Sequence, residues 1–451
     1  MHRCTLESKH DLQSIAAARP GTYPYLLDSA ADGPEGGYGL LFRSNGEHLR
    51  LFADGSLDGP GRDGGFLERL QQWYLQPKRQ TAAADGCPFA GGWFLYLGYE
   101  LAAEIEPTVG FPPAPGGFPV AFASRCPGVV YRRQGEHGTL HLAAESKALL
   151  QRMRLELESP PPAPKASASR IVGVVEEPAS VFMNALRRVR QYILDGDVFQ
   201  VNLSRGWLVD YDGTIDADGL FRRLRECNPA PFAGLARWGG RVLLSSSPER
   251  LVRVRNNVVE TRPIAGTHPR GRDAVTDAAL RSRLVADPKE RAEHIMLIDL
   301  ERNDLGRVCR PGSVEVDELM VVESYQHVHH IVSNVRGRLR PGATPVDAIR
   351  AVFPGGTITG CPKVRCMEII AELEQSGRGY YTGSMGYLGL DGAMDLNILI
   401  RSMMVHGRQA SFRTGAGIVA DSDAGAEVAE TRDKARGLLR ALAAHGGEGH
   451  A

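Results

Sequence analysis

The sequence predicts a mixed α/β protein with a large hydrophobic core. Two observations support this prediction. The first third contains short apolar runs separated by glycines, and the remainder combines amphipathic helical patterns with alternating strand patterns. The chain has 451 residues, of which 43% are hydrophobic and 24% are charged, a balance typical of globular proteins. Length alone suggests about two or three domains.

The first part of the chain, residues 1–158, is expected to be rich in strands. Short apolar runs at Pro24–Ala30, Gly39–Phe42 and Gly92–Tyr99 alternate with glycine clusters. Residues 159–169, SPPPAPKASAS, cannot continue a helix or pair centrally in a sheet. We therefore expect an exposed connection at 159–169, leading to a second part, residues 170–445, that carries the chemistry.

This second part opens with a predicted amphipathic helix followed by a strand. Asp195-Gly196 ends the helix, whose apolar stripe is expected at Val181, Ala185, Val189 and Ile193. In the predicted strand at residues 198–208, apolar residues alternate with polar ones, so that Gln200, Asn202 and Ser204 share one face. That face either lines a cavity or meets water, and the residues alone favour water.

A second helix, predicted over Pro288–Asn303, is apolar almost all round at residues 295–298 and is expected to be buried. Glu293 lies on the same face as Met296 and Leu300 of this helix. An isolated buried carboxylate is costly, so it must take up a proton, pair with a cation or bind a metal.

Further carboxylates come from the helical segment near the end of the chain. Glu427 and Glu430 are spaced i and i+3 on one face. Two helices that each offer a carboxylate suit Mg²⁺, which commonly takes one or two protein carboxylates together with waters and substrate oxygens. The alternative is that both residues face solvent and pair with Arg432 or Lys434.

Two glycine-rich segments, Pro354–Gly360 and Gly415–Gly417, are expected to be turns whose backbone N–H groups can hold carboxylate or phosphate oxygens. Neither matches the ATP-binding or dinucleotide-binding glycine patterns. Taken alone, they are better explained as small-residue turns for tight packing.

Charge and cysteine content exclude several classes of function. Lys plus Arg and Asp plus Glu both total 53, so no global basic field attracts nucleic acid or anionic lipid. We expect no membrane span, no export signal and a cytoplasmic location. The seven cysteines are expected to be free thiols, with Cys361 and Cys366 in packing roles. None lies in the G-x-C-x-G elbow of a glutaminase, so any ammonia must come from another polypeptide.

Four segments together resemble the chorismate-utilising enzymes, specifically the synthase component shared by anthranilate synthase and aminodeoxychorismate synthase. These segments are Thr261–Gly271, Ala292–Gly306, Pro354–Lys363 and Gly415–Ala435, and the resemblance extends over Phe182–Leu442. The resemblance implies one α/β unit with two large, mostly antiparallel sheets in a sandwich wrapped by helices. It also implies that the N-terminal part contributes strands to this unit.

The resemblance implies roles for individual residues. It places Mg²⁺ carboxylates on Glu293 and Glu430, with Glu427 close by, and a proposed general acid on Glu249 in SPER. In this scheme Mg²⁺ stabilises charge while the acid protonates the departing C4 hydroxyl. The other implied positions are His330 and Thr267 near the reacting ring, and substrate contacts at Tyr387, Arg401, Lys434 and the backbone of Gly415, Ala416 and Gly417.

Two positions bear on the reaction. Relatives that add water place a lysine general base where this chain has Gln200, so Gln200 favours an ammonia user. Many aminodeoxychorismate synthases carry a nucleophilic lysine where this chain has Ala265, and alanine at that position is usual in anthranilate synthases. A subclass of aminodeoxychorismate synthases also carries alanine. It uses a first ammonia at C2, giving 2-amino-2-deoxyisochorismate, and a second ammonia at C4.

Other segments resemble the aminodeoxychorismate branch: Tyr96–Leu101, Val201–Ser204, Asn228–Phe232, Glu260–Ile264 and Gly383–Leu388. We therefore expect aminodeoxychorismate synthase component I acting on chorismate, with ammonia from a glutamine amidotransferase subunit. The alternative is anthranilate synthase component I. A non-catalytic regulator would be expected to have lost the metal and acid residues, which are present. Leu26–Ser29 corresponds to a tryptophan-contacting segment of feedback-inhibited relatives, and Asp28 leaves tryptophan binding open.

Overall fold

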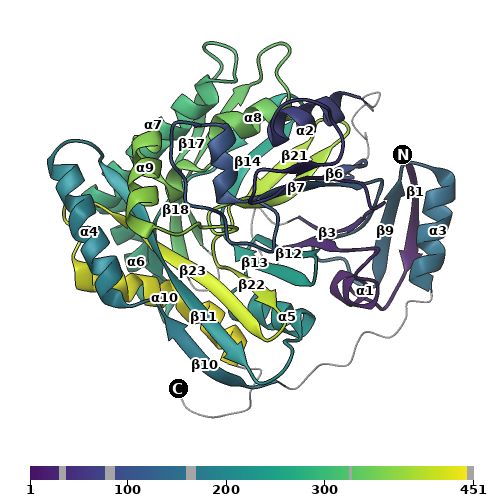
Figure 1. Cartoon of the computed structure of the whole chain (residues 1–451), viewed down its shortest axis with the longest axis horizontal. Coiled ribbons are helices and arrows are strands. Elements are labelled where there is room, and N and C mark those ends of the chain that lie inside the picture. Colours follow the sequence, from purple (N-terminus) through teal and green to yellow (C-terminus); the bar gives the residue numbers. More distant parts are fainter. Residues whose placement is uncertain (30–36, 77–86, 159–168, 325–327, 444–451) are drawn as a thin grey trace.

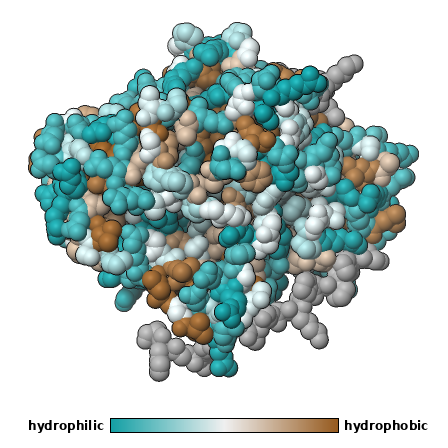
Figure 2. Space-filling model, in the orientation of Figure 1, coloured by the Kyte–Doolittle hydropathy of each residue, from teal (hydrophilic) through white to brown (hydrophobic). Residues whose placement is uncertain are grey.

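Two large antiparallel sheets lie face to face, with helices on their outer sides (Figure 1). They are seen in a computed structural model that describes residues 1–29, 37–76, 87–158, 169–324 and 328–443. The mixed α/β class and the expected sandwich of two sheets are confirmed. Hydrophilic side chains dominate the face in Figure 2, where hydrophobic ones form only small groups.

The strands of the described residues form a sheet of 12 and a sheet of 11. The first follows the order β1 (His2–Glu7), β9 (Thr139–Ala144), β8 (Gly128–Arg133), β3 (Tyr38–Arg43), β2 (Tyr25–Asp28), β12 (Phe232–Trp238), β13 (Arg241–Ser247), β22 (Ser402–His406), β23 (Gln409–Ile418), β11 (Gln200–Tyr211) and β10 (Ile171–Glu176), with β19 (Gly360–Cys361) paired to β11. The second follows the order β16 (Ile264–Pro269), β18 (Val328–Arg338), β15 (Val258–Thr261), β14 (Arg250–Arg255), β21 (Met394–Asn397), β20 (Ser384–Gly389), β6 (Gly92–Leu97), β7 (Ala121–Cys126), β4 (His48–Leu51) and β5 (Leu57–Asp58), with β17 (Glu315–Ser324) paired to β18.

Helices cover the outer faces of both sheets (Figure 1). Those in the described residues are α1 (Leu12–Ala18), α2 (Phe66–Leu75), α3 (Lys147–Glu158), α4 (Ala179–Leu194), α5 (Ala217–Cys227), α6 (Ala274–Ala286), α7 (Pro288–Gly306), α8 (Pro345–Val352), α9 (Lys363–Glu374) and α10 (Ala424–Ala443), with 3-10 turns η1 (Tyr99–Glu104) and η2 (Gly356–Ile358). None of these helices has the length and apolarity that crossing a membrane requires.

Aromatic side chains fill the space between the two sheets. Tyr25 of the first sheet stacks on Phe94 of the second with ring centroids 4.2 Å apart. Phe42 also packs edge-on against Phe94, at 5.6 Å. Separate apolar clusters lie on the outer faces, one under α2 and α8 and another under α1, α3, α5 and α10. Burial of both faces of each sheet explains why the strands carry so many apolar residues.

Strands from residues 1–158 are shared between both sheets. In the first sheet β2 pairs with β12, and in the second β6 pairs with β20. The two parts expected on either side of residues 159–169 therefore build their sheets together, as the family resemblance implied. Residues 159–168 themselves lie outside the described part of the chain.

The predicted helices are present, but their buried faces differ from expectation. In α4 the buried residues are Phe182, Leu186 and Val189, whereas Val181 is 48% exposed. In α7 one face packs against the protein and Ile295 is 44% exposed, so the prediction of burial all round was wrong. Both helices lie on the surface of the sandwich, where only one face can meet the core.

Candidate active site

The polar face of β11 points into the protein. Gln200 and Ser204 are 4% and 5% exposed, so the interpretation that this face meets water was wrong. Gln200 Nε2 donates a hydrogen bond to Glu293 Oε1 on α7 at 3.1 Å. The strand and the helix therefore place their polar groups on one shared interior site.

Four carboxylates gather beside Gln200. Two of them, Glu290 and Glu293, lie on the first turns of α7. The cap of this helix is Asp287, which accepts a hydrogen bond from the N–H of Lys289 at 2.9 Å and so fixes the position of these turns. Burial raises the pKa of Glu293, and the neighbouring negative charge of Glu290 raises it further. Glu427 and Glu430, on the first turns of α10, are the other two. The negative charge of Glu430 also raises the pKa of Glu293, so α7 and α10 face each other at this point.

This group suits a divalent cation completed by substrate. No three His, Cys, Asp or Glu side chains among the described residues converge enough to hold a metal by themselves. The buried Glu427 Oε2 and Gln200 Oε1 nevertheless have no hydrogen-bond partner within the described part of the chain. Mg²⁺ commonly takes one or two protein carboxylates and fills its other positions with water and substrate oxygens. Glu293, Glu430 and Glu427 are the residues that could hold it.

Glu249 is a buried carboxylic acid in the turn between β13 and β14. It is 6% exposed and accepts a hydrogen bond from Thr357 Oγ1 at 2.7 Å. Burial raises the pKa of Glu249 to about 7, against the opposing effects of the Thr357 hydrogen bond, Lys434 and Arg401. A large fraction is therefore protonated near neutral pH, as a general acid requires.

Two cations lie close to this acid. Burial lowers the pKa of Arg401, and the nearby Tyr381, Glu430 and Glu249 oppose this effect and raise it. Lys434 Nζ donates to the Gly415 carbonyl oxygen at 3.0 Å and also pairs with Glu430. The pair between Glu430 and Lys434 was expected under the alternative in which Glu427 and Glu430 face solvent. Arg432, the other cation named there, pairs with Glu176 outside the site.

Residues 415–417 form part of β23, so the expectation of a glycine turn was wrong there. Gly415 and Gly417 lie opposite Ser204 and Asn202 of β11. A Cβ at Gly415 would lie 2.7 Å from the Tyr381 hydroxyl, and one at Gly417 would lie 2.5 Å from Gln200 Nε2. At Gly415 a Cβ would also lie 2.5 Å from the Leu203 backbone carbonyl oxygen, so a larger residue would clash with the neighbouring strand, whereas at Gly417 it would displace the flexible end of Gln200. Ala416 points to the opposite, buried side.

His330 and Ala265 lie on the neighbouring strands β18 and β16. Ala265 pairs with Ile331, and Thr267 pairs with His330 in the backbone register. The Thr267 side chain lies outside the described part of the structure. Burial, and to a smaller extent Arg401, lowers the pKa of His330 to about 4, so the imidazole is neutral near pH 7. Ala265 is 6% exposed and supplies no nucleophile.

Tyr387 is the predicted site residue that the structure does not bring to Arg401. Its ring packs against Phe42 and Phe89, and it lines a separate cavity of about 220 Å³ together with Asp28 and Arg250. Because successive side chains of a strand point to opposite faces, Tyr387 of β20 points into the space between the sheets. Tyr381, which precedes this strand, lies beside Arg401 instead. The sequence analysis assigned this role to Tyr387 alone. Tyr381 lies six positions earlier, and only the fold brings it to this site.

We expect Tyr381→Phe to raise the KM for the substrate about tenfold, because a buried hydroxyl near Arg401 is lost. Tyr387→Phe, the matched control, should change KM less than about twofold. Steady-state kinetics with both variants measures the difference. Equal effects of the two substitutions would contradict this assignment.

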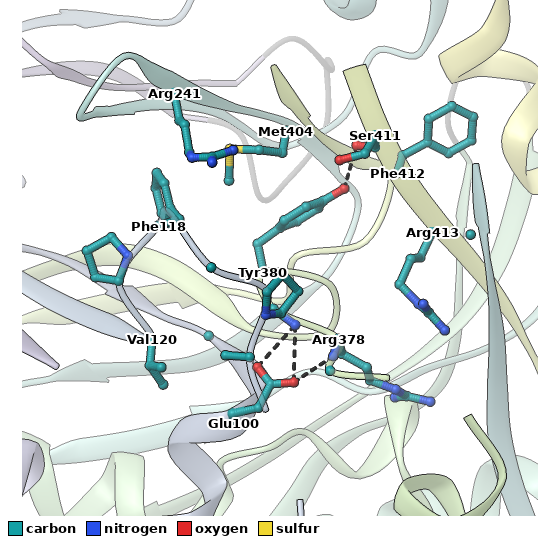
Figure 3. A pocket seen from close by; sticks show the side chains of 18 of the residues that line it. Glu100, Phe118, Val120, Arg241, Arg378, Tyr380, Met404, Ser411, Phe412 and Arg413 are labelled. Atoms are coloured by element: carbon teal, nitrogen blue, oxygen red, sulfur yellow. Dashed lines mark hydrogen bonds between the residues drawn. The ribbon is translucent and has the colours of Figure 1, made fainter. Parts of the chain in front are cut away.

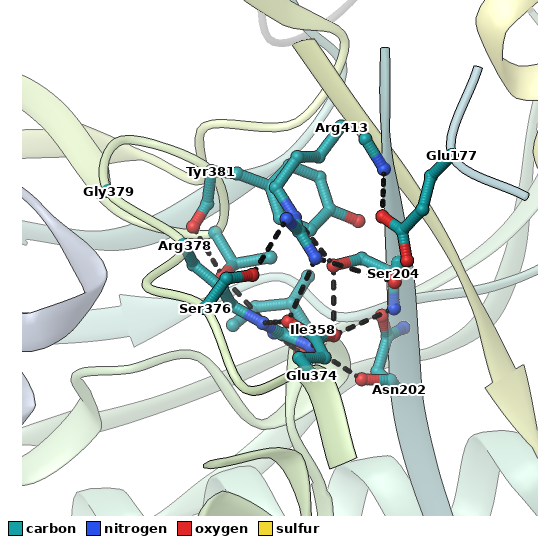
Figure 4. Close-up of polar contacts among 12 residues, drawn as sticks. Glu177, Asn202, Ser204, Ile358, Glu374, Ser376, Arg378, Gly379, Tyr381 and Arg413 are labelled. Carbon is teal, nitrogen blue, oxygen red and sulfur yellow. Dashed lines mark hydrogen bonds and ion pairs between the residues drawn. The ribbon is translucent and has the colours of Figure 1, made fainter. Parts of the chain in front are cut away.

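An ion-pair network lies behind the site (Figure 4). Glu374 at the end of α9 pairs with Arg378 at 2.7 Å and with Arg413 at 3.2 Å. Arg378 also donates to the carbonyl oxygens of Asn202 at 2.7 Å and Ile358 at 3.2 Å. The network therefore ties β11 and the η2 turn, both of which carry site residues, to α9. Although burial raises the pKa of Glu374, the two guanidinium groups lower it below its ordinary value overall.

We expect Glu374→Gln to destabilise the chain by about 3–5 kcal/mol, because it leaves two arginines without their shared carboxylate. Since the folded-state pKa of Glu374 is lowered, its stabilisation is present above its ordinary value of 4.5 and is lost as pH falls through the folded-state pKa. Urea denaturation at pH 7 and pH 4 measures both effects. Glu372→Gln, on the exposed side of the same helix, is the control and should change stability little.

All seven cysteines are free. Cys366 Sγ is buried and donates to the Gln200 carbonyl oxygen at 3.1 Å, and burial raises its pKa. It is therefore a packing residue, as expected. Thr357 and Glu290 are site residues that the sequence interpretation did not single out. Thr357 was visible only as part of a glycine-rich motif, and Glu290 only as a second acid one turn before Glu293.

The chain is similar to several known proteins. A family model described as chorismate binding enzyme matches residues 26–440. Anthranilate synthase component 1 from Cereibacter sphaeroides is 37% identical over 95% of this chain and 90% of its own. Aminodeoxychorismate synthase component 1 from Bacillus subtilis is 49% identical over 58% of this chain and 55% of its own. The crystal structure of anthranilate synthase component I from Streptococcus pneumoniae superimposes with a TM-score of 0.79, at 31% identity, over 90% of this chain and 93% of that one.

Proposed function

Because the chain belongs to the chorismate binding enzyme family, within the anthranilate synthase component I group, we propose that it is an aminodeoxychorismate synthase component I. In this proposal it converts chorismate and ammonia to 4-amino-4-deoxychorismate, the precursor of p-aminobenzoate and folate. A separate glutamine amidotransferase subunit supplies the ammonia.

The Gln200–Glu293 hydrogen bond is the observation that carries the part of the proposal in which ammonia, and not water, is the nucleophile. An amide at this position cannot take a proton from water, whereas relatives that add water have a lysine general base there. Ammonia is already a nucleophile and needs no such base. Gln200 instead orients Glu293, one of the carboxylates that would hold Mg²⁺. Bound there, the ion would stabilise negative charge on the substrate carboxylate.

The proposed reaction proceeds in two substitutions. In the first, ammonia bonds to C2, the ring double bonds shift, and the C4 hydroxyl leaves as water with the proton of Glu249. In the second, another ammonia bonds to C4 and the C2 amine leaves as ammonia after taking up a proton. Arg401 and Lys434 would hold the substrate carboxylates, and the neutral His330 would border the ring. The net change is one ammonia consumed and one water released.

Ala265 motivates the use of ammonia at C2, because it offers no amine of its own. We expect Ala265→Lys to gain mass on incubation with chorismate and Mg²⁺, as a lysine amine bonds to C2 and the C4 hydroxyl leaves as water. Intact-protein mass spectrometry measures this adduct, with Ala265→Met as a control of similar length. Absence of an adduct in a folded Lys variant would mean that residue 265 does not face C2.

The alternative is anthranilate synthase component I. It is favoured by Ala265 and by the name of a relative that aligns with 95% of the chain. The aminodeoxychorismate-like segments Asn228–Phe232 and Gly383–Leu388 argue against it. Leu27–Ser29 and Tyr387 border the same cavity, where tryptophan is a candidate ligand under either function.

The decisive test is the product. The purified chain is incubated with chorismate, Mg²⁺ and ammonium at alkaline pH, and the products are identified by chromatography with mass detection. Aminodeoxychorismate, which keeps its enolpyruvyl group and yields p-aminobenzoate when a lyase is added, supports the proposal. Anthranilate with pyruvate would establish the alternative, and unchanged chorismate would contradict both.

A further inference from the structure

A cavity of about 260 Å³ lies between the two sheets, apart from the residues of the candidate active site (Figure 3). The first sheet contributes Arg241, Met404 and Arg413 to its lining, and the second contributes Tyr96. The loops at residues 114–120 and 377–380 complete its walls. This volume is somewhat below the roughly 300–1,000 Å³ of pockets for drug-sized ligands, so it suits a ligand with a single ring.

Aromatic and aliphatic side chains form the apolar part of the lining. Phe118 packs edge-on against Tyr96 with ring centroids 4.9 Å apart. Tyr380 and Met404 also line the cavity, and the Tyr380 hydroxyl donates to the Ser411 carbonyl oxygen at 2.7 Å. Because its polar end is engaged, Tyr380 presents mainly its ring. Edge and face contacts of this kind favour a flat aromatic ligand.

Positive charge exceeds negative charge around the cavity. Arg378 and Arg413 share the single carboxylate of Glu374. Glu100 is the other acid, and it already accepts the backbone N–H groups of Arg378 at 2.6 Å and of Gly379 at 3.1 Å. Burial raises the pKa of Glu100 to about 7, so it is only partly charged near neutral pH. The three arginines therefore face fewer than two full negative charges.

Arg241 is the group available to a ligand. Its Nε donates to the Gly117 carbonyl oxygen at 2.8 Å, which holds the side chain across the 114–120 loop. Within the described residues it has no carboxylate partner. Figure 3 shows its guanidinium beside Phe118 and Met404, so a fixed cation lies next to the apolar wall. A guanidinium held by one bond can still bind a carboxylate through its terminal nitrogens.

We propose that this cavity binds a compact aromatic monocarboxylate, with the ring against Phe118, Tyr380 and Met404 and the carboxylate on Arg241. The inference does not depend on which reaction the active site performs. The Glu374 network separates the cavity from the active site, since Arg378 reaches Asn202 and Ile358 from the cavity side. Ligand and chorismate can therefore bind at the same time.

The test uses isothermal titration of the full chain with benzoate, without divalent cations. We expect saturable binding that weakens at least about tenfold in Arg241→Gln, because a charged hydrogen-bonded pair is lost. Arg241→Lys keeps the charge but not the planar fork, so it should bind between the two. Benzamide has the same shape without the charge, and it should bind at least about tenfold more weakly than benzoate. Melting temperatures of all variants check folding.

Arg401→Gln separates this site from the chorismate site. We expect it to bind benzoate as the unaltered chain does, because Arg401 does not line the cavity. Loss of benzoate binding in Arg401→Gln, with retention in Arg241→Gln, would place the ligand in the active site and overturn the proposal. No saturable binding to the unaltered chain, or equal binding of benzamide and benzoate, would overturn it as well. None of these outcomes depends on the product that the enzyme releases.

Discussion

Replacing Glu249 with Gln is expected to lower kcat by about 10²–10⁴-fold, while the KM for chorismate changes little. Glutamine keeps the size of the side chain and can still accept the hydrogen bond from Thr357. It cannot give a proton to the departing hydroxyl. The loss should therefore appear in the chemical step and leave substrate binding nearly unchanged. Steady-state kinetics at saturating ammonium measures both constants.

The pH dependence provides a second readout for Glu249. The pKa of this acid rises from an ordinary 4.5 to about 7 on folding, so the protonated form is present below about pH 7 and declines above it. The kcat of the unaltered chain should fall through this range, and the residual activity of Glu249→Gln should not. Because folding raises the pKa of Glu249, this carboxyl group contributes to the free energy of unfolding below about pH 4.5, and the contribution is lost as the pH rises to about 7.

Glu47→Gln is the control, because Glu47 is an exposed glutamate in a loop that contacts Asn45. It should keep full activity and the same pH profile. A kcat for Glu249→Gln within about fivefold of the unaltered chain would show that another group protonates the leaving hydroxyl.

Local patterns predicted much of the fold and the site. Helical spacing gave α4 and its end at Asp195-Gly196, where Gly196 has a φ of +82° that glycine adopts readily. The expected position of Glu293 on an apolar face of its helix indicated a carboxylate that needs a proton, a cation or a metal, and the structure shows it half-buried. Glu249 was unremarkable by local pattern and became a candidate through the family resemblance. Its burial and its bond to Thr357 arise from a contact 108 residues apart in the chain.

Long-range pairing explains what the sequence could not predict. The polar face of β11 was assigned to solvent because nothing local shows that α9 and α7 cover it. Ser204 contacts Glu374, which lies 170 residues further along the chain. The position of Tyr387 away from Arg401 was not predicted for the same reason, since the direction of its ring depends on how β20 enters its sheet. Residues 415–417 were expected in a turn because their strand partner in β11 is distant in sequence.

Replacing Glu293 with Ala is expected to remove the Mg²⁺-dependent stabilisation of the chain by chorismate and to lower activity at least about 100-fold. At chorismate concentrations about 100 times Kd, binding should stabilise the unaltered chain by about 2.7 kcal/mol, seen as a rise in Tm. The carboxylate group around Gln200 explains the requirement for the ion. Glu290, Glu293, Glu427 and Glu430 repel one another and the incoming substrate carboxylates, so substrate binding needs a compensating cation.

Asp299→Asn tests the specificity of this effect, because Asp299 lies on the exposed side of the same helix and, among the described residues, pairs with Arg302 alone. It should keep the full Mg²⁺-dependent shift in Tm. In Glu293→Ala the repulsion within the group is reduced, so the variant without ligand should melt no lower than the unaltered chain. A large Mg²⁺-dependent shift that survives in Glu293→Ala would mean that Glu427 and Glu430 hold the ion by themselves. In that case the role of Gln200 in orienting Glu293 would also be wrong.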